Sequence, residues 1–219
     1  MIVLIGGEKG GTGKSTIATN LAVALAMKGR DVCLVDTDRQ ATSARWSERR
    51  AQHQDLSTVH CVQKDGSLFE AAVDLAKRYE EVIIDAGGRD SREMRTAMVA
   101  ADKMYIPLRP SQPDLETSVH LDELVAQAQD INPRLRAWAL LSMACTHPSV
   151  HEADDAAELL GGLQCLQLSE VIVRTRKVFR DAIAEGKGVL EFENAKASAT
   201  IHLLFEEIYG DEVKVLAAV

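Results

Sequence analysis

The sequence has few aromatic residues and few of the cysteines whose spacing would identify a metal centre. Only 4% of its 219 residues are aromatic, and its four cysteines are Cys33, Cys61, Cys145 and Cys165. They lie far apart, with no CxxC pair and no Cys/His spacing typical of a zinc or iron–sulfur site. We therefore expect ordinary buried thiols and no cysteine-based metal centre.

Long apolar runs and excess positive charge are also missing. No stretch reaches the roughly eighteen apolar residues that a membrane-spanning helix needs, and Met1 leads directly into an apolar run without a charged leader. Acidic residues outnumber Lys and Arg by 33 to 25, which gives a net charge of −8. We expect a cytoplasmic protein in which any binding to nucleic acid or anionic membrane requires a local basic patch.

The sequence does contain short apolar runs that alternate with longer segments of helical period, a pattern typical of a parallel sheet with crossover helices. The expected strands are 1–5, 31–36, 57–62, 81–85, 103–108, 136–143 and 163–168. The expected helices are 14–28, 41–52, 67–79, 91–100, 115–130, 151–160, 177–185 and 195–209. We predict an α/β fold with a doubly wound, mostly parallel sheet in a single domain, residues 1–219.

A glycine-rich segment between the first expected strand and helix predicts nucleotide binding. Its residues are Lys9, Gly10, Gly11, Thr12, Gly13, Lys14, Ser15 and Thr16. The glycines allow a tight turn that aims backbone N–H groups at phosphate oxygens. Lys14 would neutralise β- and γ-phosphate charge, and the Ser15 hydroxyl would ligate Mg²⁺. These residues predict a P-loop NTPase fold that binds ATP with Mg²⁺, against the weaker alternative of a chance Gly-Lys-Ser in a loop.

One departure from the usual P-loop is informative. Glu8 stands five residues before Gly13, where glycine is usual, and Lys9 directly precedes the double glycine. This KGGxGK[ST] form resembles the deviant Walker A motif of the ParA/MinD ATPases. The resemblance implies that Lys9 is the signature lysine, which reaches the ATP of the partner protomer in a sandwich homodimer and acts in hydrolysis. A solvated loop charge is the alternative for Lys9.

Two carboxylates follow the apolar run 32–35. Asp36 and Asp38 lie at the edge where open α/β sheets bind ligands, and they point the same way because side chains alternate along a strand. The ParA/MinD pattern is DxDPQ, and Arg39 replaces its proline. By this resemblance Asp38 would orient the attacking water and Asp36 would support the magnesium shell. A helix N-cap is the alternative for Asp38.

A third carboxylate ends the apolar run 82–84. Asp85 matches a Walker B element and would hold a magnesium-bound water. Proteins of the ParA/MinD family commonly continue Asp-x-Pro-Pro, whereas this chain has Gly87 and Gly88 in place of the prolines. The two glycines predict a more flexible second switch.

The resemblance to ParA/MinD covers most of the chain, including 99–110 and 174–190. The chain begins almost at the P-loop, without the N-terminal helix-turn-helix domain of larger partition ATPases, and so resembles the short plasmid-type ParA proteins. An asparagine that often reads adenine after the sixth strand is not evident in 141–145. The residues that contact the base therefore stay open.

This resemblance implies a ParA-like ATPase for partition of plasmid or chromosomal DNA. ATP would drive homodimerisation, the dimer would bind nonspecific DNA on the nucleoid, and a ParB-like centromere-binding adaptor protein would stimulate hydrolysis. The candidate DNA-binding residues form a basic cluster: Arg174, Arg176, Lys177 and Arg180. The alternative is a solvated helix face, or pairing with Glu170, Asp181 and Glu185.

Two other functions stay open. A MinD-like membrane-cycling ATPase would need a C-terminal amphipathic helix with a basic flank. The apolar stripe Ile201, Leu204, Phe205 and Ile208 is flanked by Glu206, Glu207, Asp211 and Glu212. We predict that this stripe packs on the sheet, and we expect no stable membrane binding. A metabolic ATPase of the same fold, such as dethiobiotin synthetase, is the other alternative; the nitrogenase iron protein would need cluster cysteines that are missing between Cys61 and Cys145.

Overall fold

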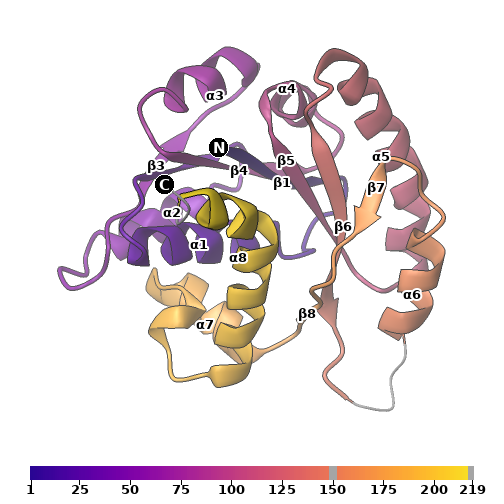
Figure 1. Ribbon diagram of the computed structural model, residues 1–219. Helices are drawn as coiled ribbons and strands as arrows, with labels where there is room; N and C mark the ends of the chain where they lie inside the picture. Colours follow the sequence, from indigo (N-terminus) through magenta and orange to yellow (C-terminus); the bar gives the residue numbers. More distant parts are fainter. Residues whose placement is uncertain (148–151, 217–219) are drawn as a thin grey trace.

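The chain folds around a parallel sheet whose strands lie in the order β3-β2-β4-β1-β5-β6-β7, with a short strand β8 paired to β6 (Figure 1). The structure is a computed structural model that describes residues 1–147 and 152–216, with side chains described through residue 210. The strands are β1 (Ile2–Gly7), β2 (Val32–Asp36), β3 (His60–Gln63), β4 (Glu81–Gly88), β5 (Lys103–Leu108), β6 (Arg136–Ala144), β7 (Leu166–Leu168) and β8 (Val173–Arg174).

Helices connect these strands as the sequence predicts. They are α1 (Lys14–Met27), α2 (Thr42–Arg50), α3 (Phe69–Leu75), α4 (Arg92–Ala100), α5 (Gln112–Ile131), α6 (Glu152–Leu160), α7 (Lys177–Glu185) and α8 (Ala195–Leu216), with a 3-10 turn η1 (Val189–Glu191). The prediction of a doubly wound parallel sheet is confirmed, since every strand pairing is parallel. The predicted first residue of the sixth helix, His151, lies outside the described residues.

The two faces of the sheet have separate cores. Alternate strand residues divide between them, so that Ile2 and Leu4 face one core while Val3 and Ile5 face the other. Helices α3, α4, α5 and α6 cover the first face, and α1, α2, α7 and α8 cover the second (Figure 1). The predicted apolar stripe of α8 is buried in the second core, which confirms that this stripe packs on the sheet.

Some predicted boundaries are wrong, and β4 matters most for the site. It continues past Asp85 to Gly88, so the structure places both glycines in a strand rather than in a loop. Gly88 pairs with Gly7, and a Cβ on Gly88 would lie 2.9 Å from the Gly10 backbone. Glycine is needed here because the end of β4 runs against the glycine-rich turn. Sequence analysis also missed β8 and η1, which are very short and whose pairing and packing come from residues distant in the chain.

Candidate functional site

The glycine-rich turn joins β1 to α1 at the carboxyl edge of the sheet. Gly11 and Gly13 have φ of +70° and +93°, a region that favours glycine. Gly13 is the N-cap of α1 and has no side-chain cap, so the helix begins with free backbone N–H groups near the positive end of its dipole. Such a turn can bind a phosphate group.

Lys14 is the first residue of α1 and points inward. It is 7% exposed, and its Nζ donates to the Lys9 carbonyl at 2.5 Å. Burial lowers the pKa of the Lys14 ammonium, while the charges of Asp85 and Asp38 act in the opposite direction. The ammonium is thus held beside the turn, and the two nearby carboxylates favour its charged form, which is the form that neutralises phosphate charge.

Asp85 is a buried carboxylate with one oxygen unsatisfied. It is 1% exposed; its Oδ2 accepts from Ser43 Oγ at 2.6 Å, and its Oδ1 has no hydrogen-bond partner. Burial raises the pKa of Asp85 to about 7, while the hydrogen bond from Ser43 and the nearby Ser15 hydroxyl lower it. An orphaned buried oxygen beside the Ser15 hydroxyl fits a hard cation with oxygen ligands such as Mg²⁺.

Asp36 and Asp38 both bind backbone N–H groups near the start of α2. The two Asp36 oxygens accept from Asp38 N at 3.0 Å and Ala44 N at 2.9 Å. Asp38 Oδ1 accepts from Gln40 N at 2.9 Å. The N-cap of α2 is Ala41, with φ of +51° and no side-chain cap, so the alternative of Asp38 as a helix cap is wrong. Asp38 lies against Gly87, so the ends of β2 and β4 meet here.

The signature-lysine candidate has a different environment. Lys9 is half-buried at the outer edge of the turn, and among the described side chains none pairs with its ammonium. The described part of the chain therefore offers no partner that explains a lysine at this position.

A cavity of about 220 Å³ lies beside the turn. One wall is the turn and α1, including Gly13 and Ile17; the other is formed by the end of β6 and the segment from β8 into α7. Ser142 is 1% exposed, with an unpartnered Oγ, and Met143 has φ of +57°, a backbone conformation that few non-glycine residues adopt. The cavity combines apolar walls with unsatisfied polar atoms, the usual character of a small-molecule site.

Residues 1–131 match the protein family described as the ATPase MipZ, which is more than half of the chain. The chain belongs to this family of ATPases.

Relatives and solved structures agree with this assignment. The carboxysome distribution protein A of Halothiobacillus neapolitanus is 29% identical over 204 residues, 91% of this chain and 92% of that protein. A structure described as a plasmid partition protein of Borrelia burgdorferi B31, bound to AMPPNP, has a TM-score of 0.74 at 17% identity and covers 96% of this chain and 98% of that one. The MinD protein of Pyrococcus horikoshii OT3, complexed with Mg-ADP, has a TM-score of 0.71 at 18% identity and covers 94% and 95%.

In this ATPase the basic cluster lies only partly beside the other predicted site residues. Arg174, Arg176 and Arg180 line the cavity beside the P-loop, whereas exposed Lys177 pairs with Asp181 at 2.8 Å. Arg174 donates to the Cys145 carbonyl at 2.5 Å, and Arg176 Nε is buried without a hydrogen-bond partner. The cluster is therefore divided between the cavity and the outer face of α7.

Several residues of the candidate site were not predicted from the sequence. Ser43 bonds Asp85, Ser142 and Met143 line the cavity, and Phe179 lies under it. A signal was available for Ser142 and Met143, since they end a parallel strand at the edge where such sheets bind ligands. No helix among the residues described is long and apolar enough to cross a membrane. The side chains of Asp211 and Glu212, invoked against membrane binding, lie outside the described ones.

Proposed function

We propose that this ATPase positions a cellular cargo by a ParA-like cycle of ATP binding, dimerisation, attachment to nonspecific DNA and hydrolysis stimulated by a partner. The observation that supports it most directly is the group formed by buried Lys14, the unsatisfied Asp85 oxygen and the glycine turn. These groups would bind the phosphates and Mg²⁺, and the adjacent cavity would take the nucleoside.

Within the nucleotide site, each residue has a separate task. Backbone N–H groups of residues 10–16 and the Lys14 ammonium would hold the β- and γ-phosphates. Ser15 and Asp85 would hold Mg²⁺, with Asp36 supporting its shell; when bound, the ion neutralises phosphate charge. Asp38 would orient the attacking water: its Oδ1 accepts from Gln40 N, while its Oδ2 has no hydrogen-bond partner among the described residues and is available to a water molecule.

Lys9 gives the physical argument for a dimer. An ammonium with no partner among the described side chains of its own chain is available to the γ-phosphate bound by a second copy. That contact would exist with ATP and be lost with ADP, so the two nucleotide states would differ in assembly. We place the dimer in the cytoplasm, on the nucleoid, with a ParB-like centromere-binding adaptor as the partner that stimulates hydrolysis.

The proposed DNA surface uses Arg174, Arg176, Lys177 and Arg180. If a dimer presents all of these cations and each neutralises one phosphate, log affinity should fall with log salt at a slope of roughly −7. If the exposed Lys177 and Arg180 alone contact DNA, the slope should be roughly −4. The slope therefore distinguishes DNA binding by all four cations of each protomer from binding by the two exposed ones.

The cargo has two candidates. Plasmid or chromosomal DNA is the one that the short plasmid-type resemblance implies. A non-DNA cargo is favoured by the similarity over 91% of this chain to a protein of carboxysome distribution. A membrane-cycling role has less support, because the apolar stripe of α8 is buried against the sheet.

The experiment is light scattering and duplex-DNA binding, each with ATP·Mg²⁺ and with ADP·Mg²⁺. We expect ATP to double the mass of the wild type and to permit DNA binding at low salt. Lys9→Ala should bind ATP and remain a monomer. A mutant that still doubles its mass with ATP would show that Lys9 does not act across the dimer, and a wild type that binds no DNA with ATP at low salt would remove DNA from the proposal.

A further inference from the structure

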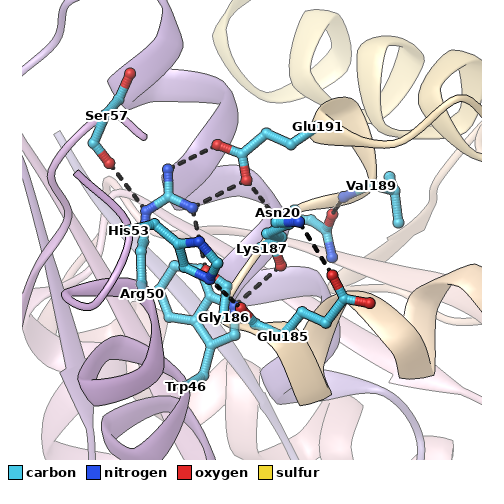
Figure 2. A network of polar contacts seen from close by, with 11 residues as sticks. Asn20, Trp46, Arg50, His53, Ser57, Glu185, Gly186, Lys187, Val189 and Glu191 are labelled. Carbon is cyan, nitrogen blue, oxygen red and sulfur yellow. Dashed lines mark hydrogen bonds and ion pairs between the residues drawn. The ribbon is translucent and has the colours of Figure 1, made fainter. Parts of the chain in front are cut away.

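A buried network joins the end of α2 to the loop that follows α7 (Figure 2). Arg50 is the last residue of α2 and is 3% exposed. Its Nη1 and Nη2 bind the two oxygens of Glu191 at 2.9 and 2.8 Å, a bidentate pair. Its Nε donates to the Ser57 carbonyl at 2.9 Å, and Nη1 also reaches the Gly186 carbonyl at 3.2 Å. Every nitrogen of this guanidinium has an acceptor, so its position is strongly determined.

The backbone around this pair is closely packed. Gly186 has φ of +70°, and a Cβ there would lie 2.4 Å from the backbone nitrogen of Arg50. Trp46, which is fully buried in α2, donates from Nε1 to the Lys187 carbonyl at 3.0 Å. Glu191 Oε2 also accepts from Gly188 N at 2.8 Å. The loop 186–191 is thus held against α2 by contacts that leave little room for either to shift alone.

A second connection runs from the same loop to Asn20 in α1 (Figure 2). Asn20 is fully buried in α1 and accepts from Val189 N at 2.7 Å through its Oδ1. Its Nδ2 donates to the carbonyl of Thr16 at 2.7 Å. Thr16 is the last residue of the phosphate-binding segment, so the loop 186–191 is tied at one side to α2 and at the other to the P-loop.

The other end of α2 bears directly on the site. Ala44 N donates to Asp36, and Ser43 donates to Asp85, both from the first turn of α2. At the opposite end of α7, Phe179 and Arg180 line the cavity beside the P-loop. A fixed arrangement of α2 against the loop 186–191 therefore fixes the carboxylates of the site relative to the phosphate turn.

We infer that Arg50 and Glu191 are a positioning pair for ATP hydrolysis, which holds α2 so that the segment Asp36–Asp38 lies correctly over the phosphate site. The inference rests on the proposed function. A purely stabilising role would not require this pair, because apolar side chains of similar volume often replace a buried ion pair at no loss of stability. The bidentate fork specifies a position that apolar contacts do not.

The test is the double variant Arg50→Met with Glu191→Met, which removes both charges together and leaves neither buried alone. Expected results are a kcat at least tenfold lower, a Kd for ATP·Mg²⁺ within threefold of the wild type, and partial recovery of kcat in Arg50→Lys. The control is Arg30→Met, which removes an ion pair at the amino end of β4, where Arg30 Nη2 lies 2.6 Å from Glu81 Oε1, and leaves Glu81 its ion pair with the Met1 amino group at 3.5 Å. This control should keep both kcat and Kd.

A second measurement does not depend on hydrolysis. Hydrogen exchange should be at least tenfold faster at the amide of Ala44 in the double variant, with the amides of β1 and β5 unchanged. Unchanged exchange at Ala44, an unchanged kcat, or an equal loss of kcat in the Arg30→Met control would overturn the inference. A wild type that neither binds nor hydrolyses ATP would instead overturn the proposed function, and the exchange result would still decide the positioning role.

Discussion

Two segments border the same cavity and are held in different ways. The P-loop, residues 9–16, is held mainly by contacts within itself and α1, such as Lys14 to the Lys9 carbonyl and Ile17 N to the Gly13 carbonyl. The segment 173–191 is held by residues distant in the sequence: β8 pairs with β6, and Arg50 and Asn20, each more than a hundred positions away, bind the loop that follows α7. The P-loop can therefore be predicted from local sequence, whereas the segment 173–191 cannot. Variants of the P-loop should lose ATP binding or hydrolysis completely, and variants around the segment 173–191 should lose them in part.

The largest effect should come from Lys14→Ala in the P-loop. The variant should fold, because the main interaction of the ammonium is with a loop carbonyl, and it should fail to bind ATP. A ligand at a hundred times its Kd stabilises a protein by about 2.7 kcal/mol, so ATP·Mg²⁺ should raise the melting temperature of the wild type and leave the variant unchanged. An equal rise in both proteins would contradict the assignment of Lys14 to the phosphates.

The next largest effect should come from Asp38→Ala, at a position just after β2 and beside the phosphate-binding turn. The phosphate contacts would remain while the orientation of the water would be lost, so ATP should bind normally and kcat should fall by about a hundredfold or more. ATP-bound dimers should accumulate, which size-exclusion chromatography would detect. Unchanged turnover would restrict Asp38 to its observed hydrogen bond with Gln40 N.

A smaller effect concerns Asp85 and pH in the protein without nucleotide or metal. Because burial raises the pKa of Asp85 to about 7 from 3.8, the folded state binds this proton more tightly than the unfolded state. Its contribution to stability is present below about pH 4 and is lost as pH rises to 7. Asp85→Asn should therefore be more stable than the wild type at pH 8 by about 1 to 4 kcal/mol, with little difference near pH 4.

Urea unfolding in the presence of a chelator, at pH 4 and pH 8, would measure this difference. Adding ATP·Mg²⁺ at pH 8 should stabilise the wild type and do little for Asp85→Asn, because the carboxylate that would hold the ion is gone. A difference in stability that does not change with pH would show that Asp85 is not the group responsible.

The sequence predicts these features unequally, for physical reasons. Strands and helices were predictable because their periodicity is local, and the P-loop because its glycines, lysine and serine are consecutive. The role of Gly88 was not, because its need for glycine arises from the Gly10 backbone in another loop. Ser142 was missed for a similar reason: its place near the end of a parallel strand points to the ligand-binding edge of the sheet, but its contacts with Gly13 and the cavity it shares with α7 arise only in the folded chain.

The smallest effect should come from Ser142→Ala, at the border between the two segments. The Ser142 Oγ is buried without a partner, which costs free energy in the empty protein and would be repaid by a hydrogen bond to the bound nucleotide. Removing the hydroxyl should leave the nucleotide-free protein as stable or slightly more stable, and should weaken ATP binding by about 1 kcal/mol, roughly fivefold in Kd. The two effects have opposite signs, which a general loss of packing would not produce.

The matched control is Ser118→Ala in α5, where a hydroxyl of similar burial donates to the Leu115 carbonyl at 2.6 Å. Its loss should leave Kd unchanged and should not stabilise the empty protein, because the hydroxyl removed already has a partner. Isothermal titration with ATP·Mg²⁺ and thermal unfolding without nucleotide would separate the two serines. If Ser142→Ala binds ATP as tightly as the wild type, the bound nucleotide makes no hydrogen bond to the Ser142 hydroxyl.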